Sequence, residues 1–216
     1  MPIDIAVVPV AGHGTRLLPA TKSQPKEMLP VGRKPVVQYV VEELATAGIR
    51  RLLFVTGARK SAIENHFDED HQLSTYLRES GREEELAELD FERQQMEYFY
   101  TRQRRQLGLG HAVLCARPLI GSQPFVVALG DSIIGLHAKS GIVSRMLEEF
   151  DRTRADVVIA FEEVPAAEVE RYGIAEPMGA VGDRFELRRI VEKPSAAEAP
   201  SNLAVVGRYI LSPQIF

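Results

Sequence analysis

The segment "IDIAVVPVAGHGTRLLPATKSQPKEMLPV", residues 3–31, joins a short apolar run to a long loop rich in glycine, proline and basic side chains. The run at 3–8 predicts a strand, and "KPVVQYVVEELATAG" predicts a helix over 35–47 with Pro35 at its first position and Gly48 just beyond its end. Connections between a strand and the next helix usually take about 2–6 residues. The much longer connection here indicates a loop with a function of its own.

The rest of the chain alternates predicted strands with predicted helices, which is typical of an α/β fold. Because strands separated by helices pair in parallel, we expect a mostly parallel sheet with helices on both faces and a small antiparallel subregion towards the end. The acidic stretch 68–95 is expected to form a helical pair on the surface. The expected strands are 51–57, 96–101, 124–129, 155–164, 173–176, 184–191 and 203–211, and the expected helices are 60–67, 110–116 and 140–153.

The composition is that of an ordinary globular protein. Hydrophobic residues make up 45% and charged residues 26% of the 216 positions, and the net charge is −4. This acidic balance argues against a nucleic-acid scaffold, and the single cysteine, Cys115, excludes an intrachain disulfide. No apolar stretch approaches the roughly 18 residues of a membrane span, and no signal-type apolar region is present. We therefore expect a cytoplasmic protein without nucleic-acid or membrane partners.

The glycines and basic residues of the first loop suggest a site for phosphate groups. Gly12 and Gly14 would let the backbone approach a ligand closely, although a plain tight turn uses glycine in the same way. A dinucleotide-binding fingerprint needs a third glycine and an immediate helix, and a Walker A loop needs G-K-[ST]; the loop has neither pattern. Arg16 and Lys26 can bind phosphate oxygens, whereas Lys22 is more simply a solvated side chain.

Further polar residues follow other predicted strands, where ligands of open α/β sheets bind. Asp131 comes directly after the apolar strand 124–129, where a carboxylate needs a partner. Mg²⁺, bound through one or two carboxylates plus substrate phosphates, would be such a partner, and a turn or capping aspartate is the alternative. Glu192 and Lys193, at the end of the strand 184–191, are either a surface pair or an acid for sugar hydroxyls beside a lysine for a phosphate.

Five motifs together resemble a known family in sequence and in order. They are "VPVAGHGTRLLPATKSQPKEMLPV", "GLGHAVLCA", "RYGIAEP", "VEKP" and "APSNLAVVGRYIL". The chain is similar along nearly its whole length to the bacterial UTP–glucose-1-phosphate uridylyltransferases (UDP-glucose pyrophosphorylases), a branch of the sugar-nucleotide pyrophosphorylases. The resemblance implies a Rossmann-like nucleotidyltransferase domain over 1–216, with a nucleotide-binding portion at about 1–135 and a sugar-binding portion at about 136–216. Family members continue beyond "SPQIF", so we expect the chain to lack their C-terminal part.

The resemblance also implies the reaction and the residues that perform it. A uridylyl group passes from UTP to glucose 1-phosphate, giving UDP-glucose and pyrophosphate, with Mg²⁺ as cofactor. Backbone groups of Ala11 and Gly12 meet the uracil, and Gln103 reads its edge. The implied set is Arg16, Lys26 and Lys193 for catalysis; Ala11, Gly12, Gly14, Thr15, Gln103 and Gly108 for the nucleotide; Gly173 and Glu192 for the sugar; and Asp131 for the metal.

Two departures from the family pattern lie beside "GLGHA". Leu107 stands where the family usually has a lysine, and "RRQ" at 104–106 replaces smaller residues. A thymidylyltransferase making dTDP-glucose and a non-catalytic nucleotide-sugar-binding paralogue are the alternative functions. A homo-oligomer is expected for full-length members of the family.

Overall fold

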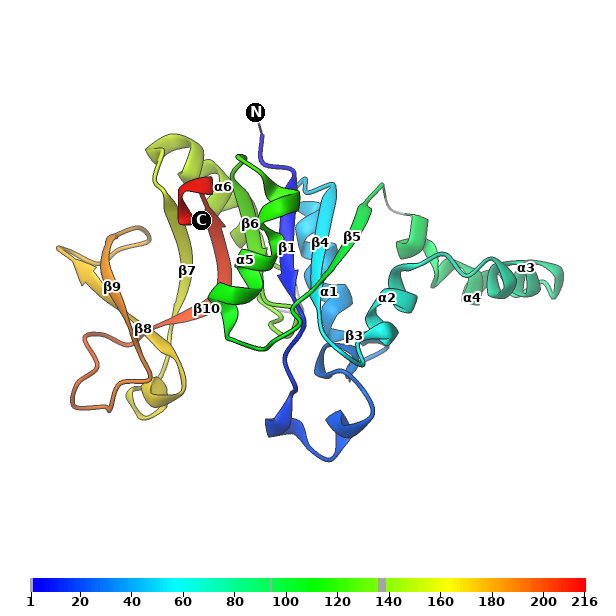
Figure 1. The fold of residues 1–216 in the computed structure, drawn as a ribbon, viewed down its shortest axis with the longest axis horizontal. Helices are drawn as coiled ribbons and strands as arrows, with labels where there is room; N and C mark the ends of the chain where they lie inside the picture. The colour runs from blue at the N-terminus through cyan, green and yellow to red at the C-terminus, as the bar shows by residue number, and fades with distance from the viewer. Residues whose placement is uncertain (1, 94, 136–138) are drawn as a thin grey trace.

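The computed structural model describes residues 2–93, 95–135 and 139–216, and it is organised around an eight-stranded sheet (Figure 1). The strand order is β5-β4-β1-β6-β10-β8-β9, and β7 also pairs with β10. Strands β5, β4, β1 and β6 pair in parallel, whereas β10 is antiparallel to β6, β7 and β8, and β9 is antiparallel to β8. All of these strands except β9 and β10 therefore point the same way, which confirms the expected mixed, mostly parallel sheet. The strands are β1 (Ile5–Pro9), β4 (Arg51–Thr56), β5 (Glu97–Arg102), β6 (Phe125–Ala128), β7 (Val157–Glu163), β8 (Gly173–Met178), β9 (Glu186–Glu192) and β10 (Leu203–Leu211).

Helices cover both faces of the parallel half, as the alternation of strands and helices predicted. Alternate residues of β1 point to opposite faces, so Ala6 and Val8 belong to one buried cluster and Ile5 and Val7 to another. The first cluster includes residues of α1, α2 and α6, and the second includes residues of α5. The helices on the first face are α1 (Val36–Thr46), α2 (Ser61–Phe67) and α6 (Ile142–Thr153), and the helix on the second face is α5 (Leu109–Ile120). No helix within the described ranges is long and apolar enough to cross a membrane.

The two ends of α1 show one correct and one wrong expectation. The Gly48 amide donates to the Ala45 carbonyl at 3.1 Å and the Ile49 amide to the Leu44 carbonyl at 3.1 Å, a Schellman ending with Gly48 beyond the helix as predicted. Pro35 is not the first helical residue, because it is extended (φ −68°, ψ 151°) and belongs to β3. Strand β3 (Lys34–Pro35) pairs with β2 (Pro30–Val31), and this tertiary pairing delays the helix by one residue.

The acidic stretch forms the expected surface helices. They are α3 (His71–Glu79) and α4 (Glu83–Ala87), and they extend to one side of the sheet, away from its centre (Figure 1). Leu77 and Leu86 are buried, whereas Leu73 is exposed. The pair therefore contributes little to the core and does not approach the strand ends described next.

Strand β10 carries the β8–β9 hairpin at the carboxyl edge of the parallel strands. Its C-terminal half pairs with β6, with Arg208 opposite Ala128 at the carboxyl end of that strand. Its N-terminal half continues past β6, where Ala204 pairs with Ile174 of β8. Residues at the start of β8 and at the end of β9 consequently lie beyond the carboxyl edge of the parallel strands.

Candidate active site

The long loop after β1 folds back on itself through three short 3₁₀ turns, at Thr15–Leu17, Ala20–Lys22 and Lys26–Met28. The Thr21 hydroxyl donates to the Gly14 carbonyl at 2.7 Å. Gly14 has φ +69°, and a Cβ on it would lie 3.2 Å from both Lys26 Cβ and Thr21 Cγ2. Only glycine meets both conditions without strain. The loop thereby places Lys26 against the glycine segment, while Thr15 and Arg16 are exposed in the first turn.

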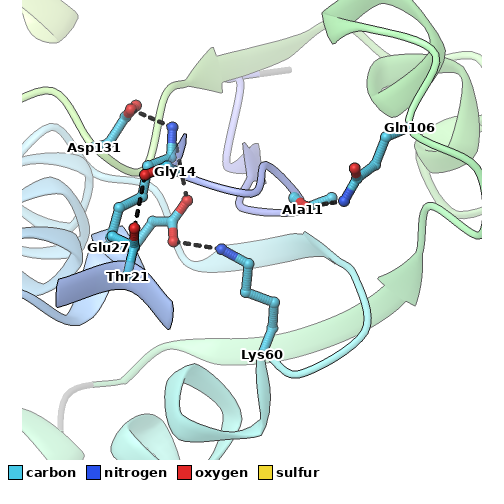
Figure 2. A network of polar contacts seen from close by, with 8 residues as sticks. Ala11, Gly14, Thr21, Glu27, Lys60, Gln106 and Asp131 are labelled. Atoms are coloured by element: carbon cyan, nitrogen blue, oxygen red, sulfur yellow. Dashed lines mark hydrogen bonds and ion pairs between the residues drawn. The ribbon is translucent and has the colours of Figure 1, made fainter. Parts of the chain in front are cut away.

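Four charged side chains of alternating sign follow one another at this edge. Lys26 Nζ lies 2.5 Å from Asp131 Oδ2 and 4.0 Å from Glu27 Oε1. On its far side Glu27 accepts a hydrogen bond from Lys60 Nζ at 2.7 Å (Figure 2). Lys26 and Asp131 are 23% and 37% exposed, whereas Glu27 and Lys60 are 1% and 6% exposed. The outer pair is thus open to a ligand, and the inner pair supports it.

Burial of Glu27 has an electrostatic consequence. Removal from water raises the pKa of the Glu27 carboxyl, and the opposing charge and hydrogen bond of Lys60 lower it by less. A buried charged pair contributes little net stability, but loss of one partner leaves a costly uncompensated charge. The pair therefore fixes the position of the turn that carries Lys26.

Asp131 is held in place by contacts that the sequence did not reveal. It follows β6, and the next residue, Ser132, accepts a hydrogen bond on its carbonyl from Arg208 Nη2 at 2.8 Å. Arg208 is fully buried and also donates from Nε and Nη2 to Glu43 Oε2, at 3.0 and 2.6 Å. The α1 helix and β10 are thereby linked to the loop after β6. The signal for Arg208 was a lone arginine inside the apolar strand "LAVVGRYIL".

Residues predicted for the base lie at the ends of β1 and β5. Gln103 is buried, and its Nε2 lies 3.0 Å from both the Gly108 carbonyl and His111 Nδ1. Gln106 of the same loop donates from Nε2 to the Ala11 carbonyl at 2.7 Å (Figure 2). The structure therefore brings the predicted Ala11, Gln103 and Gly108 to one place, and it adds Gln106, to which the sequence gave no role beyond its place in the departure "RRQ".

The residues predicted for the sugar form a second group beside β8. A Cβ at Gly173 would lie 3.2 Å from Glu192 Oε2, so the carboxylate lies over the start of β8. Lys193 Nζ is 3.6 Å from Glu192 Oε1, and both side chains are largely exposed. Lys193 adopts φ +48°, with its amide donating to the Tyr172 carbonyl at 2.9 Å. A non-glycine residue in this region of backbone space is strained and is often found at functional sites.

The described residues contain no cluster of three or more His, Cys, Asp or Glu side chains able to hold a metal alone. Asp131 is a single partly exposed carboxylate just after β6, at the carboxyl edge of the parallel strands. Such a site fits Mg²⁺, which commonly binds through one or two carboxylates and completes its shell with water and substrate phosphates. The assignment of the site residues to ligands stays a prediction.

Comparison with known proteins identifies the family of this chain. A family model described as nucleotidyl transferase matches residues 5–216. The chain belongs to the nucleotidyl transferase family. Within this family, the chain is 46% identical over 214 residues to UTP–glucose-1-phosphate uridylyltransferase of Staphylococcus haemolyticus, an alignment that covers 99% of the chain and 73% of that protein. The resemblance seen in the motifs is confirmed.

Solved nucleotidyl transferase structures agree. The UTP-bound UGPase of Acinetobacter baumannii matches with a TM-score of 0.90 at 40% identity, over 98% of this chain and 75% of that one. A UDP-glucose pyrophosphorylase complexed with UDP-glucose matches with a TM-score of 0.87 at 38% identity, over 99% and 78%. A putative glucose-1-phosphate thymidylyltransferase from Bacillus anthracis matches with a TM-score of 0.71 at 26% identity, over 97% and 72%. The expected nucleotidyltransferase fold is confirmed, and the uridylyl branch is the nearer of these two.

Proposed function

We propose that this nucleotidyl transferase moves a uridylyl group from UTP to glucose 1-phosphate, giving UDP-glucose and pyrophosphate. Support comes from the similarity to uridylyltransferases over nearly the whole chain, together with neighbours whose structures hold UTP and UDP-glucose. The thymidylyltransferase alternative is supported by a more distant match, at 26% identity. The observation that carries the proposal is the pairing of Lys26 and Asp131 beside the glycine loop, because it provides a cation and a metal-ligating anion for a triphosphate.

The chemistry follows from positioning and charge. A phosphate oxygen of glucose 1-phosphate attacks the α-phosphorus of UTP, the bond from the α-phosphorus to the bridging oxygen breaks, and pyrophosphate leaves with the electron pair. The attacking oxygen is already an anion at neutral pH, so no general base is required. Lys26 and Arg16 neutralise the triphosphate and the leaving pyrophosphate, and Lys193 holds the sugar phosphate. Gly173 and Glu192 contact the glucose.

Asp131 is the residue proposed to hold Mg²⁺. The ion would supply charge neutralisation and alignment of the phosphates. Lys26 already contacts Asp131, so the two side chains must separate at least in part when a metal and a triphosphate enter. Their partial exposure favours this, because an ion pair open to water is weak.

The test is a pyrophosphate-release assay with UTP or dTTP, glucose 1-phosphate or other sugar 1-phosphates, and Mg²⁺ present or removed by EDTA. We expect turnover with UTP, glucose 1-phosphate and Mg²⁺, and clearly less with dTTP. A preference for dTTP would favour the thymidylyltransferase, and binding of UDP-glucose without turnover would favour the non-catalytic paralogue.

A matched pair of variants tests the metal ligand in the same assay. Asp131→Asn keeps the shape of the side chain but loses its charge, and it should abolish Mg²⁺-dependent turnover. Asp183→Asn is the control, because Asp183 is an aspartate that is 95% exposed in another part of the molecule. Near-normal turnover of Asp131→Asn at saturating Mg²⁺ would show that Asp131 is only a turn residue.

A further inference from the structure

The carbonyl oxygen of Ala11, at the end of β1, is enclosed on two sides. On one side lies Gly57, where a Cβ would come within 3.1 Å of this oxygen. On another side Gln106 Nε2 donates a hydrogen bond to it at 2.7 Å. Ala11 itself is only 4% exposed. Gly57 therefore crowds this oxygen, and a ligand that approaches it from the side of Gln106 has to displace the Gln106 amide.

Gln106 is poorly anchored apart from this contact. Its side chain is exposed, on the loop between β5 and α5, and the bond to Ala11 is the side-chain hydrogen bond that the described structure shows for it. Gln103 of the same loop is different, since it is buried and ties the loop to Gly108 and His111. Gln103 therefore supports the loop from within, whereas Gln106 reaches from this loop to the loop after β1.

The chemistry of the contact matches that of a nucleobase. An amide N–H of Gln106 points at a backbone carbonyl, and a uracil or thymine ring carries an imide N–H that can make the same bond. Under the proposed function Ala11 lies at the base. We propose that Gln106 controls access to the base site. In the free protein its amide occupies the Ala11 carbonyl, and UTP binding displaces it; we call this contact the Gln106 gate. This inference rests on the proposed function.

Such a gate weakens nucleotide binding by a calculable factor. The apparent dissociation constant equals the intrinsic constant divided by the fraction of molecules with the acceptor free. The net strength of an ordinary neutral hydrogen bond corresponds to a factor of about 2 to 12. Removing the Gln106 donor should therefore lower the dissociation constant for UTP about 2- to 12-fold. Pyrophosphate carries no base and should bind equally well with or without the donor.

The experiment measures binding by calorimetry with UTP and Mg²⁺ in the absence of glucose 1-phosphate, so that no turnover occurs. Gln106→Met keeps the length of the side chain and removes the donor, and Gln106→Ala removes both. Gln72→Met on the exposed face of α3 is the control for the same chemical change. We expect both Gln106 variants to bind UTP about 2- to 12-fold more tightly than the wild type, with pyrophosphate binding unchanged and the control equal to the wild type.

A second measurement follows the side chain itself. The NMR signals of the Gln106 side-chain amide, assigned by their loss in Gln106→Met, should shift when UTP saturates the protein and stay in place with pyrophosphate. The proposal that Gln106 blocks the Ala11 carbonyl would be overturned if a folded Gln106→Met variant bound UTP as weakly as the wild type or more weakly. It would also be overturned if the Gln106 amide signals did not respond to UTP. Failure of the wild type to bind UTP would instead overturn the proposed function, and the gate with it.

Discussion

Substitution of Arg208 by methionine should cost a large part of the stability of the fold. Arg208 is 0% and Glu43 6% exposed, and the two are joined at 2.6 Å. Glu43 Oε1 is already buried with no hydrogen-bond partner in the described structure. Arg208→Met would leave the whole carboxylate buried without its counter-charge and the Ser132 carbonyl without its donor. Breaking a buried pair in this way costs about 3–5 kcal/mol.

The structure also predicts how much of the lost stability a second substitution, Glu43→Leu, restores. At about 2–4 °C per kcal/mol for a chain of this size, Arg208→Met should lower Tm by roughly 6–20 °C. Arg208→Met with Glu43→Leu removes the stranded carboxylate, but the Ser132 carbonyl still lacks its charged donor, a contact worth about 1.5–3 kcal/mol. The double variant should therefore recover about 2 kcal/mol, within the coupling range measured for contacting residues.

Urea and thermal denaturation followed by circular dichroism measure these differences. Arg152→Met is the control, because Arg152 Nη2 makes the same 2.6 Å contact, to Glu149, with its side chain 60% exposed. Its Tm should stay close to that of the wild type. The reasoning is refuted if Arg208→Met and Arg152→Met lower Tm equally, or if the losses from Arg208→Met and Glu43→Leu simply add.

Three further predictions concern the site. Lys26→Ala should chiefly lower kcat, by roughly 10²–10³, because charge shifts towards the leaving pyrophosphate in the transition state. Lys193→Ala should instead chiefly raise KM for glucose 1-phosphate. Steady-state kinetics with each substrate varied in turn test both expectations, and weaker UTP binding in Lys193→Ala would contradict the second. Gln103→Ala should blur the choice between UTP and CTP more than it slows the reaction with UTP, and an unchanged preference in competition assays would reject the role of Gln103. Lys60→Met should raise the pKa of Glu27 beyond its already raised value. The stability linked to Glu27 in this variant is then present at low pH and is lost as the pH rises. The Tm loss relative to the wild type should therefore be larger at about pH 8 than at about pH 5, and a pH-independent loss would contradict this.

Local patterns predicted most of the elements because each depends on neighbouring residues. The apolar run of β1 and the Gly48 ending of α1 are such features, and both are present. Pro35 was misplaced because its extended conformation comes from the β2–β3 pairing. The position of β10 between β6 and β7 could not be predicted from the sequence either, because strand partners that are distant in sequence leave no local pattern.

In the candidate site, too, some residues could be predicted from the sequence and others could not. Lys26 was recognised in the long loop after β1 and Asp131 just after the strand 124–129, and the two meet where this loop folds back beside the end of β6. Glu27 and Lys60 were missed because a charged residue beside a loop is normally solvated. Both are buried where α1 and α2 pack against the turn that carries Glu27. Three-dimensional burial, which no short motif encodes, separates these supporting residues from surface charges.

Burial also separates the contacts that must persist from those that must change during a reaction cycle. The Glu27–Lys60 and Glu43–Arg208 pairs are almost inaccessible to water. Separating either pair would leave an unpaired charge in an interior of low dielectric constant, which is strongly unfavourable. The Lys26–Asp131 contact and the Gln106–Ala11 bond involve exposed or partly exposed side chains, which water and ligands can reach. Their exchange for phosphate, metal or base is therefore inexpensive. A site arranged in this way can admit a triphosphate by replacing its outer contacts while the inner pairs keep the loop and the strand ends in register.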